Sequence, residues 1–336
     1  MNIENLQEVL SDQPKYRAKQ AEKAVFEELI SDWEEATTLP KALREKLNQE
    51  CPLQINGEIF KTDDKKTVKA LLTLDDGKKI ETVLMLHQDR RHTVCISSQV
   101  GCALKCGFCA TGEAGFKRNL TAEEMISQVL FFGRYLKKNK FVDDRITNVV
   151  FMGMGEPLLN YDNVMSAIKF INSENGLNIG ARKISISTAG VISGIKKLAK
   201  ENLQINLAIS LHAANDKLRQ KLMPIAQDNS LEELIKAMDE YLKKTKRQVM
   251  IEYILIDGVN DSVEQAKELA DLLKGRLVMV NLIACNPVKQ FKPSPAPVIA
   301  KFKNMLLRER IVVTERYRYG REIDAACGQL AGDKNA

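Results

Sequence analysis

Three cysteines, Cys102, Cys106 and Cys109, follow one another with the spacing C-x3-C-x2-C. Cysteine thiolates at short spacings of this kind hold iron–sulfur clusters, and three of them would leave one iron of a 4Fe–4S cluster open to a small molecule. Zinc is the first alternative, but a closed zinc site needs a fourth ligand, for which Cys95 and His92 are the nearest upstream residues. A redox-active dithiol formed by Cys106 and Cys109 is the second alternative. The spacing favours the cluster.

From about residue 93 the chain alternates between short β-branched or apolar runs and amphipathic helical stretches. The runs lie at 93–96, 147–152, 183–187, 205–210, 249–256, 277–283 and 311–314. Three of the helical stretches begin with capping-box pairs, which are Thr121 with Glu124, Ser230 with Glu233, and Ser262 with Gln265. Strands that alternate with helices predict an α/β fold with a parallel sheet, curled into a full or partial barrel.

Most other residues suited to chemistry come just after these runs. The cysteine triplet follows the first run, and the later segments are Gly153-Met-Gly155-Glu156-Pro157, Ser187-Thr-Ala-Gly190, Ser210-Leu211-His212 and Cys285-Asn286-Pro287. In parallel βα folds the active site forms at the C-terminal ends of the strands, so we expect these segments to ring one mouth. Glycine lets backbone approach a ligand, and serine and asparagine suit a nucleoside-bearing one. Taken singly, the glycine segment is more often a tight turn and His212 a structural histidine.

The first 92 residues predict two smaller units. Residues 1–50 have helical spacing, and a break at Leu39-Pro40 precedes a shorter helix near 42–47. The apolar face of the first helix is expected to contain Val25, Phe26, Leu29, Ile30 and Trp33. Residues 51–92 show period-two alternation on both sides of Asp76-Gly77, which is typical of a β-hairpin. The expected division is a helical accessory domain at 1–50, a β-hairpin linker region at 51–92, and a barrel core with its C-terminal segment at 93–336.

Length and composition are those of a soluble globular protein. The 336 residues are 44% hydrophobic and 28% charged, and they contain no apolar run long enough to span a membrane. The N-terminal residues lack the basic and apolar regions of a signal peptide. We therefore expect a cytoplasmic protein, in which the seven cysteines are ligands or catalysts rather than structural disulfides. A net charge of +6 permits a nucleic-acid partner, and nothing requires more than a monomer.

The C-terminal part adds two features. The segment Arg316-Tyr317-Arg318-Tyr319-Gly320-Arg321 interleaves arginine with aromatic rings, a composition suited to phosphate contact and base stacking. We interpret its arginines and tyrosines as a candidate RNA-binding face, with a solvated strand as the alternative. Further on, Cys327 lies between small residues and a glycine, an open setting that suits a nucleophilic thiol.

Three motifs together resemble the adenosine-methylating radical S-adenosylmethionine (SAM) family RlmN/Cfr. They are Cys95-Ile-Ser-Ser-Gln-Val-Gly-Cys102-Ala-Leu-Lys-Cys106-Gly-Phe-Cys109, Met152-Gly-Met-Gly-Glu-Pro-Leu158 and Ile323-Asp-Ala-Ala-Cys-Gly-Gln-Leu330. The resemblance extends over nearly the whole chain, including the N-terminal helical module. The family comprises adenine-C2 methyltransferases of rRNA and tRNA and adenine-C8 methyltransferases that confer antibiotic resistance. It implies a partial (β/α)6 radical-SAM barrel.

The resemblance implies a role for five of the cysteines. Cys102, Cys106 and Cys109 would hold a 4Fe–4S cluster whose open iron binds SAM. One SAM would methylate Cys327, and a second, reductively cleaved, would give a 5′-deoxyadenosyl radical that takes hydrogen from the S-methyl group. The resulting carbon radical would add to the adenine ring. Cys95 would then free the methylated RNA by forming a transient disulfide with Cys327.

Further roles follow from the same resemblance. Glu81 is the candidate proton acceptor. The positions that match SAM contacts are Gly155, Glu156, Ser187, Ser210, Leu211, His212 and Asn286. The implied partners are large-subunit (23S) rRNA, tRNA as well, and a reducing protein such as flavodoxin or ferredoxin. Cys51 and Cys285 match no catalytic role, and we expect them to be buried small hydrophobic side chains.

We favour carbon 2 of adenine as the target, because the Gly-Glu-Pro-Leu and Gln-Val-Gly-Cys segments look more like the C2 branch. The first alternative is an adenine-C8 rRNA methyltransferase that confers ribosomal antibiotic resistance. The second is a zinc-stabilised, non-catalytic RNA-binding protein. The third is a radical-SAM enzyme that acts on a small molecule or peptide, against which the pair Cys95 and Cys327 argues.

Overall fold

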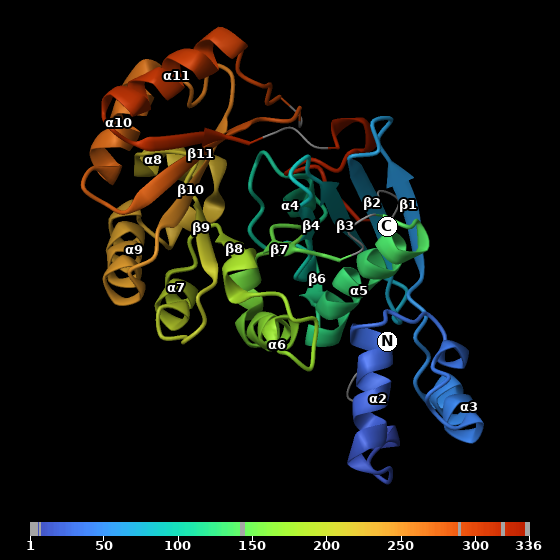
Figure 1. Ribbon diagram of the computed structural model, residues 1–336. Helices are drawn as coiled ribbons and strands as arrows, with labels where there is room; N and C mark the ends of the chain where they lie inside the picture. The colour runs from blue at the N-terminus through green and yellow to red at the C-terminus, as the bar shows by residue number, and fades with distance from the viewer. Residues whose placement is uncertain (1–5, 7, 142–144, 288–289, 317–319, 333–336) are drawn as a thin grey trace.

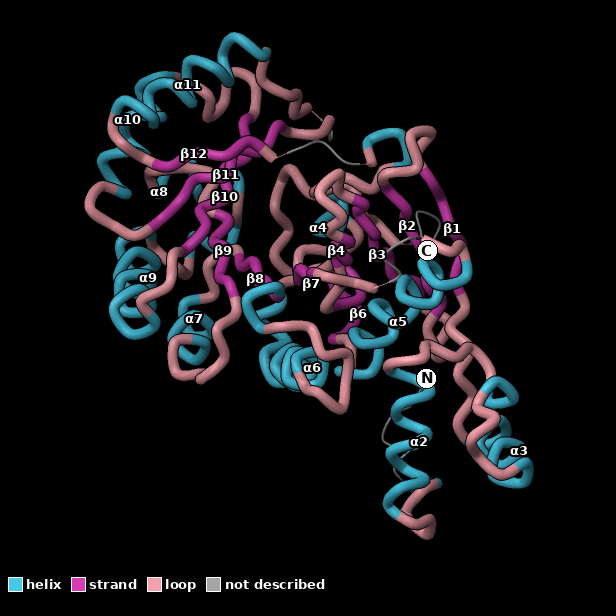
Figure 2. The backbone as a smooth tube through the Cα atoms, viewed as in Figure 1, coloured by secondary structure: helices cyan, strands magenta, loops and turns pink. Residues whose placement is uncertain are grey.

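The computed structural model describes the chain except for residues 1–5, 7, 142–144, 288–289, 317–319 and 333–336, and the side chain of Arg321. Its central feature is a ten-stranded sheet with the order β1-β2-β3-β4-β7-β8-β9-β10-β11-β12. The seven strands from β4 onward in this order run parallel. They are β4 (His92–Cys95), β7 (Asn148–Phe151), β8 (Ile184–Thr188), β9 (Asn206–Ser210), β10 (Val249–Leu255), β11 (Val278–Ala284) and β12 (Val312–Glu315). Figure 2 shows the strands as one curved series, which confirms the predicted partial barrel.

Helices follow the parallel strands, and most of them cover the outer side of the curve (Figure 1). They are α5 (Ala122–Lys138), α6 (Tyr161–Asn172), α7 (Ile192–Leu198), α8 (Asp216–Leu222), α9 (Leu231–Thr245), α10 (Val263–Leu273) and α11 (Ala296–Arg308), with short 3-10 turns η2 (Pro157–Asn160), η3 (Ala181–Lys183) and η4 (Pro224–Gln227). The predicted capping boxes are confirmed at Thr121 and Ser262. The side chain of Ser230 also accepts a backbone N–H at the start of its helix, but without the reciprocal bond of a capping box. None of the described helices is both long and apolar enough to cross a membrane.

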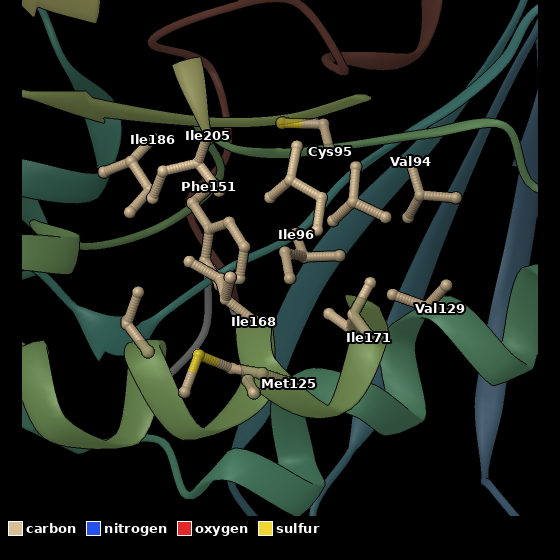
Figure 3. Packing of buried hydrophobic residues seen from close by; sticks show 14 of the residues in the cluster. Val94, Cys95, Ile96, Met125, Val129, Phe151, Ile168, Ile171, Ile186 and Ile205 are labelled. Atoms are coloured by element: carbon tan, nitrogen blue, oxygen red, sulfur yellow. The ribbon is translucent and has the colours of Figure 1, made fainter. Parts of the chain in front are cut away.

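Part of the hydrophobic core lies between the parallel strands and helices α5 and α6 (Figure 3), and the same cluster continues to α9, α10 and α11. Strand-side residues drawn there are Val94, Ile96, Phe151 and Ile186, and helix-side residues are Met125, Val129, Ile168 and Ile171. Helices cover this face of the sheet, and the strands read as nearly continuous apolar runs. These apolar runs are the reason that the strands could be predicted from the sequence. Cys51 and Cys285 are buried, as predicted.

The N-terminal helical region is interrupted where the sequence predicted one continuous apolar face. It consists of α2 (Lys15–Phe26), the 3-10 turn η1 (Trp33–Glu35) and α3 (Lys41–Glu50), and α3 confirms the shorter second helix. The first helix ends before Leu29, whose φ of 53° is left-handed. Trp33 is fully buried, and its indole N–H donates to the carbonyl of Cys51 at 2.8 Å. Tertiary packing of Trp33 therefore outweighs the helical spacing.

The hairpin predicted around Asp76-Gly77 is confirmed, and a third strand precedes it. The strands are β1 (Gly57–Lys61), β2 (Thr67–Thr73) and β3 (Lys79–Leu86), each antiparallel to its neighbour. Because β3 also pairs antiparallel with β4, the hairpin extends the barrel sheet. The first of these strands is exposed along its whole length, so it lacks the apolar alternation by which a half-buried strand is recognised.

Candidate active site

The cysteine triplet lies in a loop that a small two-stranded sheet holds in place. Strands β5 (Gln99–Gly101) and β6 (Phe116–Asn119) pair antiparallel, and the short helix α4 (Ala110–Glu113) lies between them. At Gly101 φ is +74°, and an added Cβ would lie 1.7 Å from the carbonyl oxygen of Gly115. Glycine therefore lets the two strands meet at the point where the loop begins. The three cysteine side chains that follow are half-buried and face one pocket.

This pocket, at the C-terminal ends of the parallel strands, receives most of the predicted site residues. Its lining includes Cys102, Cys106, Cys109, Cys95, Cys327, Gly155, Glu156, Ser187, Ser210 and His212. Such convergence is expected of strand ends in a parallel βα fold. Three predicted residues, Glu81, Leu211 and Asn286, do not line it.

The donor set of the loop fits an iron–sulfur cluster better than zinc. Among the described residues, no three cysteine, histidine, aspartate or glutamate side chains are placed to hold a single metal ion, as a tetrahedral zinc site would require. A cluster instead takes each thiolate on a separate iron. Burial raises the pKa of Cys102 to about 11 and also raises that of Cys106. Bound metal would favour the thiolate form of both side chains, against the effect of burial.

Cys95, which ends β4, and Cys327, near the C-terminus, line the same pocket as two thiols. Burial, followed by the neighbouring Cys327, raises the pKa of Cys95 to about 12. Burial also raises the pKa of Cys327. The guanidinium of Arg316 acts on both thiols in the opposite direction. Two thiols beside a cationic group form an arrangement that suits thiol–disulfide exchange.

The segment that carries Cys327 is attached to the cysteine loop through its backbone. The N–H of Ala110 donates to the carbonyl of Gly328 at 2.8 Å, and the hydroxyl of Thr111 donates to the carbonyl of Leu330. Asn286, predicted as a SAM contact, donates from Nδ2 to the carbonyl of Cys327 at 2.9 Å. It lines a smaller pocket next to the main one. These contacts fix the backbone from Cys327 onward.

Glu252 on β10 is a pocket residue that the sequence reasoning missed. It is 5% exposed, and its carboxylate accepts hydrogen bonds from the hydroxyls of Ser187 at 2.9 Å and Ser210 at 3.3 Å. Its other oxygen pairs with Arg316 at 3.2 Å. The available signal was a lone carboxylate within the apolar run Val249–Leu255, since buried glutamates are rare unless they are paired.

Glu156 is buried at the start of η2, on the wall of the pocket. Its carboxylate accepts two backbone N–H groups, the shorter bond coming from Ala189 at 2.7 Å. Burial raises the pKa of Glu156 to about 7. The preceding Gly155 has a φ of +96°, and an added Cβ would lie 2.5 Å from the side chain of Gln99. This glycine is therefore required by its backbone conformation and by the close packing around it.

His212 has a structural role as well as a place in the pocket wall. Its Nδ1 accepts the backbone N–H of Ile254 at 3.1 Å, and Phe108 packs edge-to-face on its ring. Burial lowers the pKa of His212 to about 3, so the ring is neutral at physiological pH. Leu211 is fully buried, and its backbone N–H bonds to the carbonyl of Glu252.

Glu81 lies outside the pocket, and the candidate RNA-binding residues are only partly described. Glu81 on β3 lies behind the Cys327 segment, where its carboxylate accepts the N–H of Ala331 at 2.6 Å. Of the candidate RNA-binding side chains, only Arg316 is described, and it pairs with Glu252 in the pocket instead of facing solvent. Those of Tyr317, Arg318, Tyr319 and Arg321 are outside the described part of the chain.

The curled parallel sheet and the cysteine loop at its mouth define a class of enzyme. Residues 96–273 match the family described as the radical SAM superfamily, and the chain belongs to it. Membership implies a 4Fe–4S cluster and SAM as cofactors.

Similar proteins show which family of the radical SAM superfamily the chain belongs to. The chain is 47% identical over 320 residues to the probable dual-specificity RNA methyltransferase RlmN of Dictyoglomus turgidum, an alignment of 95% of this chain and 91% of the relative. It is 46% identical to the ribosomal RNA large subunit methyltransferase N of Nitrosopumilus maritimus, over 95% and 93% of the two chains. The crystal structure of a radical SAM methyltransferase from Sphaerobacter thermophilus matches with a TM-score of 0.94 and 44% identity, covering 99% and 98% of the two chains. The chain therefore belongs to the RlmN family.

Proposed function

We propose that the protein methylates carbon 2 of a specific adenosine in 23S large-subunit rRNA, and also in tRNA. The observation that carries this proposal is the meeting of two thiols, Cys95 and Cys327, in the pocket that the cysteine loop faces. The names of the relatives, dual-specificity RNA methyltransferases, support the same conclusion. Adenine C2 is electron-poor and is no nucleophile toward SAM, so the enzyme needs radical chemistry and a methyl carrier.

In this proposal Cys102, Cys106 and Cys109 would hold the cluster, which would supply the electron for the reductive cleavage of SAM. The residues assigned to the SAM site are Gly155, Glu156, Ser187, Ser210, Leu211, His212 and Asn286. The buried Glu252 orients the hydroxyls of Ser187 and Ser210, because it accepts a hydrogen bond from each. The pocket walls keep water from the reactive carbon.

Cys327 carries the methyl group. Its sulfur takes CH₃ from one SAM as the thiol loses its proton. After the 5′-deoxyadenosyl radical takes a hydrogen atom from this S-methyl group, the resulting carbon radical would bond to adenine C2. The adduct would then lose one electron to the oxidised cluster and the C2 hydrogen as a proton, which leaves the RNA joined to Cys327 through a thioether. Cys95, as thiolate, attacks the Cys327 sulfur, so that the S–S bond forms as the C–S bond breaks. The electron pair of the broken bond goes to the RNA carbon, which takes up a proton. The family resemblance suggests Glu81 as the proton acceptor, although both of its carboxylate oxygens already have partners, the N–H of Ala331 and the ammonium of Lys69.

The partners complete the proposal. RNA would approach the pocket beside the segment 316–321, and a flavodoxin or ferredoxin would deliver the electron. We propose a cytoplasmic monomer divided into a helical unit at 1–50, a hairpin unit at 51–92 and a barrel unit at 93–336. The continuity of β3 with β4 supports a hairpin that is docked firmly on the barrel.

Nucleoside analysis of rRNA and tRNA from cells with and without this protein tests the proposal. We expect 2-methyladenosine in both RNAs to depend on the protein. If 8-methyladenosine were the only product, the C2 assignment would be wrong. If neither nucleoside depended on the protein, RNA methylation would be excluded.

A further inference from the structure

Glu81 is one of the most fully partnered carboxylates in the described part of the chain. Its Oε2 accepts two backbone N–H groups, from Ala331 at 2.6 Å and from Gly332 at 3.1 Å. Its Oε1 pairs with the ammonium of Lys69 at 2.7 Å. The two residues are 5% and 8% exposed. Hydrogen bonds to a charged group are roughly twice as strong as neutral ones.

Lys69 also contacts the Cys327 segment. Its Nζ lies 3.5 Å from the carbonyl oxygen of Asp324 and 5.4 Å from the centre of the Phe60 ring. Because Lys69 is on β2 and Glu81 on β3, the pair joins the hairpin to both sides of the reactive cysteine. One partner reaches position 324 and the other reaches positions 331 and 332.

The segment 324–332 is thus held on two faces, with Cys327 between them. Asn286 and the helix α4 hold the face toward the pocket, and Lys69 with Glu81 holds the face toward the hairpin. The hairpin is therefore tied to this segment on both sides of Cys327.

We propose that Glu81 and Lys69 form a clamp that positions the Cys327 segment for methyl acceptance. The inference rests on the function proposed above, and it makes Glu81 a positioning residue. As the structure stands, Glu81 does not line the pocket, and both of its oxygens are occupied. A proton acceptor needs an oxygen that faces its substrate. The clamp therefore explains the buried carboxylate of Glu81 by its contacts, without giving it a role in proton transfer.

The test compares Glu81→Gln and Lys69→Met in the anaerobically purified holoenzyme. Lys66→Met, which removes a charge from an exposed pair on the same hairpin, is the matched control. Hydrogen exchange followed by mass spectrometry reports the amides of Ala331 and Gly332, and peptide mass reports the S-methylated fraction of Cys327. In both test variants we expect exchange at these amides to be faster by about tenfold, as for the loss of a hydrogen bond to a charged group. The methylated fraction should fall in parallel, while exchange in β10 stays unchanged.

The result that overturns the clamp is normal exchange and full Cys327 methylation in Glu81→Gln, with an RNA adduct that is not released. That result would make Glu81 the proton acceptor. Normal amide exchange and normal methylation of Cys327 in Lys69→Met would also exclude the clamp, because Glu81 alone would then hold the segment in place. Amide exchange requires no RNA, so the clamp is tested whichever adenine carbon is methylated.

Discussion

The side chain of Asn286 donates a 2.9 Å hydrogen bond to the backbone carbonyl of Cys327. This contact joins the end of β11 to the C-terminal segment, and so it links the sixth strand of the barrel to the thiol that the proposed reaction methylates. A residue expected to bind SAM therefore has a second task in the placement of Cys327. The two tasks are separable by experiment.

Replacing Asn286 with alanine should lower the S-methylated fraction of Cys327. The lost hydrogen bond is worth about 1 kcal/mol, which loosens the segment without unfolding the barrel. Peptide mass measures the modification, and Asn175→Ala at an exposed loop position serves as the control. SAM affinity, measured on the same variant, separates the two tasks: lower methylation with unchanged SAM affinity assigns the loss to the contact with Cys327. Full methylation of Cys327 in Asn286→Ala would contradict both tasks.

Cys95→Ala should trap a covalent protein–RNA adduct, because no thiol remains to attack the thioether at Cys327. A denaturing gel with labelled RNA detects the adduct, and nuclease digestion followed by peptide mass locates it at Cys327. Cys51→Ala is a suitable control, since this buried cysteine is not among the residues that line the site. Release of methylated RNA at the normal rate would contradict the role of Cys95.

The release step should accelerate with pH. Burial raises the pKa of Cys95 to about 12, so below that pH the thiolate is a small fraction that grows about tenfold for each pH unit. Decay of the adduct, followed in single turnover between pH 7.5 and 9, should show this slope. A rate that does not change over this range would mean that thiolate formation is not limiting.

The ion pair between Arg316 and Glu252 offers a double-mutant test. Arg316→Met should cost about 3 kcal/mol of stability, because Glu252 would be left buried without its cation. It should also slow release of the adduct, because the guanidinium favours both thiolates. In the double variant with Glu252→Met, the free energy of unfolding should return toward normal, whereas release of the adduct should stay slow. Denaturant unfolding and adduct decay measure the two effects, and parallel recovery of both would contradict a role for Arg316 at the thiols.

Much of the fold was predictable because its strands are buried. Continuous apolar runs located the parallel strands, and capping pairs located three helix starts. Strand β1 was not predictable because its exposed residues follow no apolar period. The break after Phe26 was missed because the burial of Trp33, a contact distant in sequence, overrides local spacing.

The site was predictable where spacing or strand-end position marks a residue. The cysteine loop and Ser187, Ser210 and His212 meet in one pocket for that reason. Contacts between distant segments were not predictable. The backbone partners of Glu81, Ala331 and Gly332, lie 250 and 251 positions further along the chain, and Arg316 lies in the pocket, where it pairs with Glu252. No local pattern records either contact.

Gly101→Ala should disrupt cluster binding, and Gly77→Ala provides a closely matched control. Both glycines have a positive φ, +74° and +79°, so alanine at either position costs about 1 kcal/mol of backbone strain. At Gly77 nothing lies within 4 Å of the added Cβ, whereas at Gly101 the Cβ would meet the carbonyl oxygen of Gly115. The strands β5 and β6 must then separate, which displaces the loop that carries Cys102, Cys106 and Cys109. Iron and sulfide per chain should fall in Gly101→Ala and remain normal in Gly77→Ala. Equal iron content in the two variants would show that the loop tolerates separation of these strands.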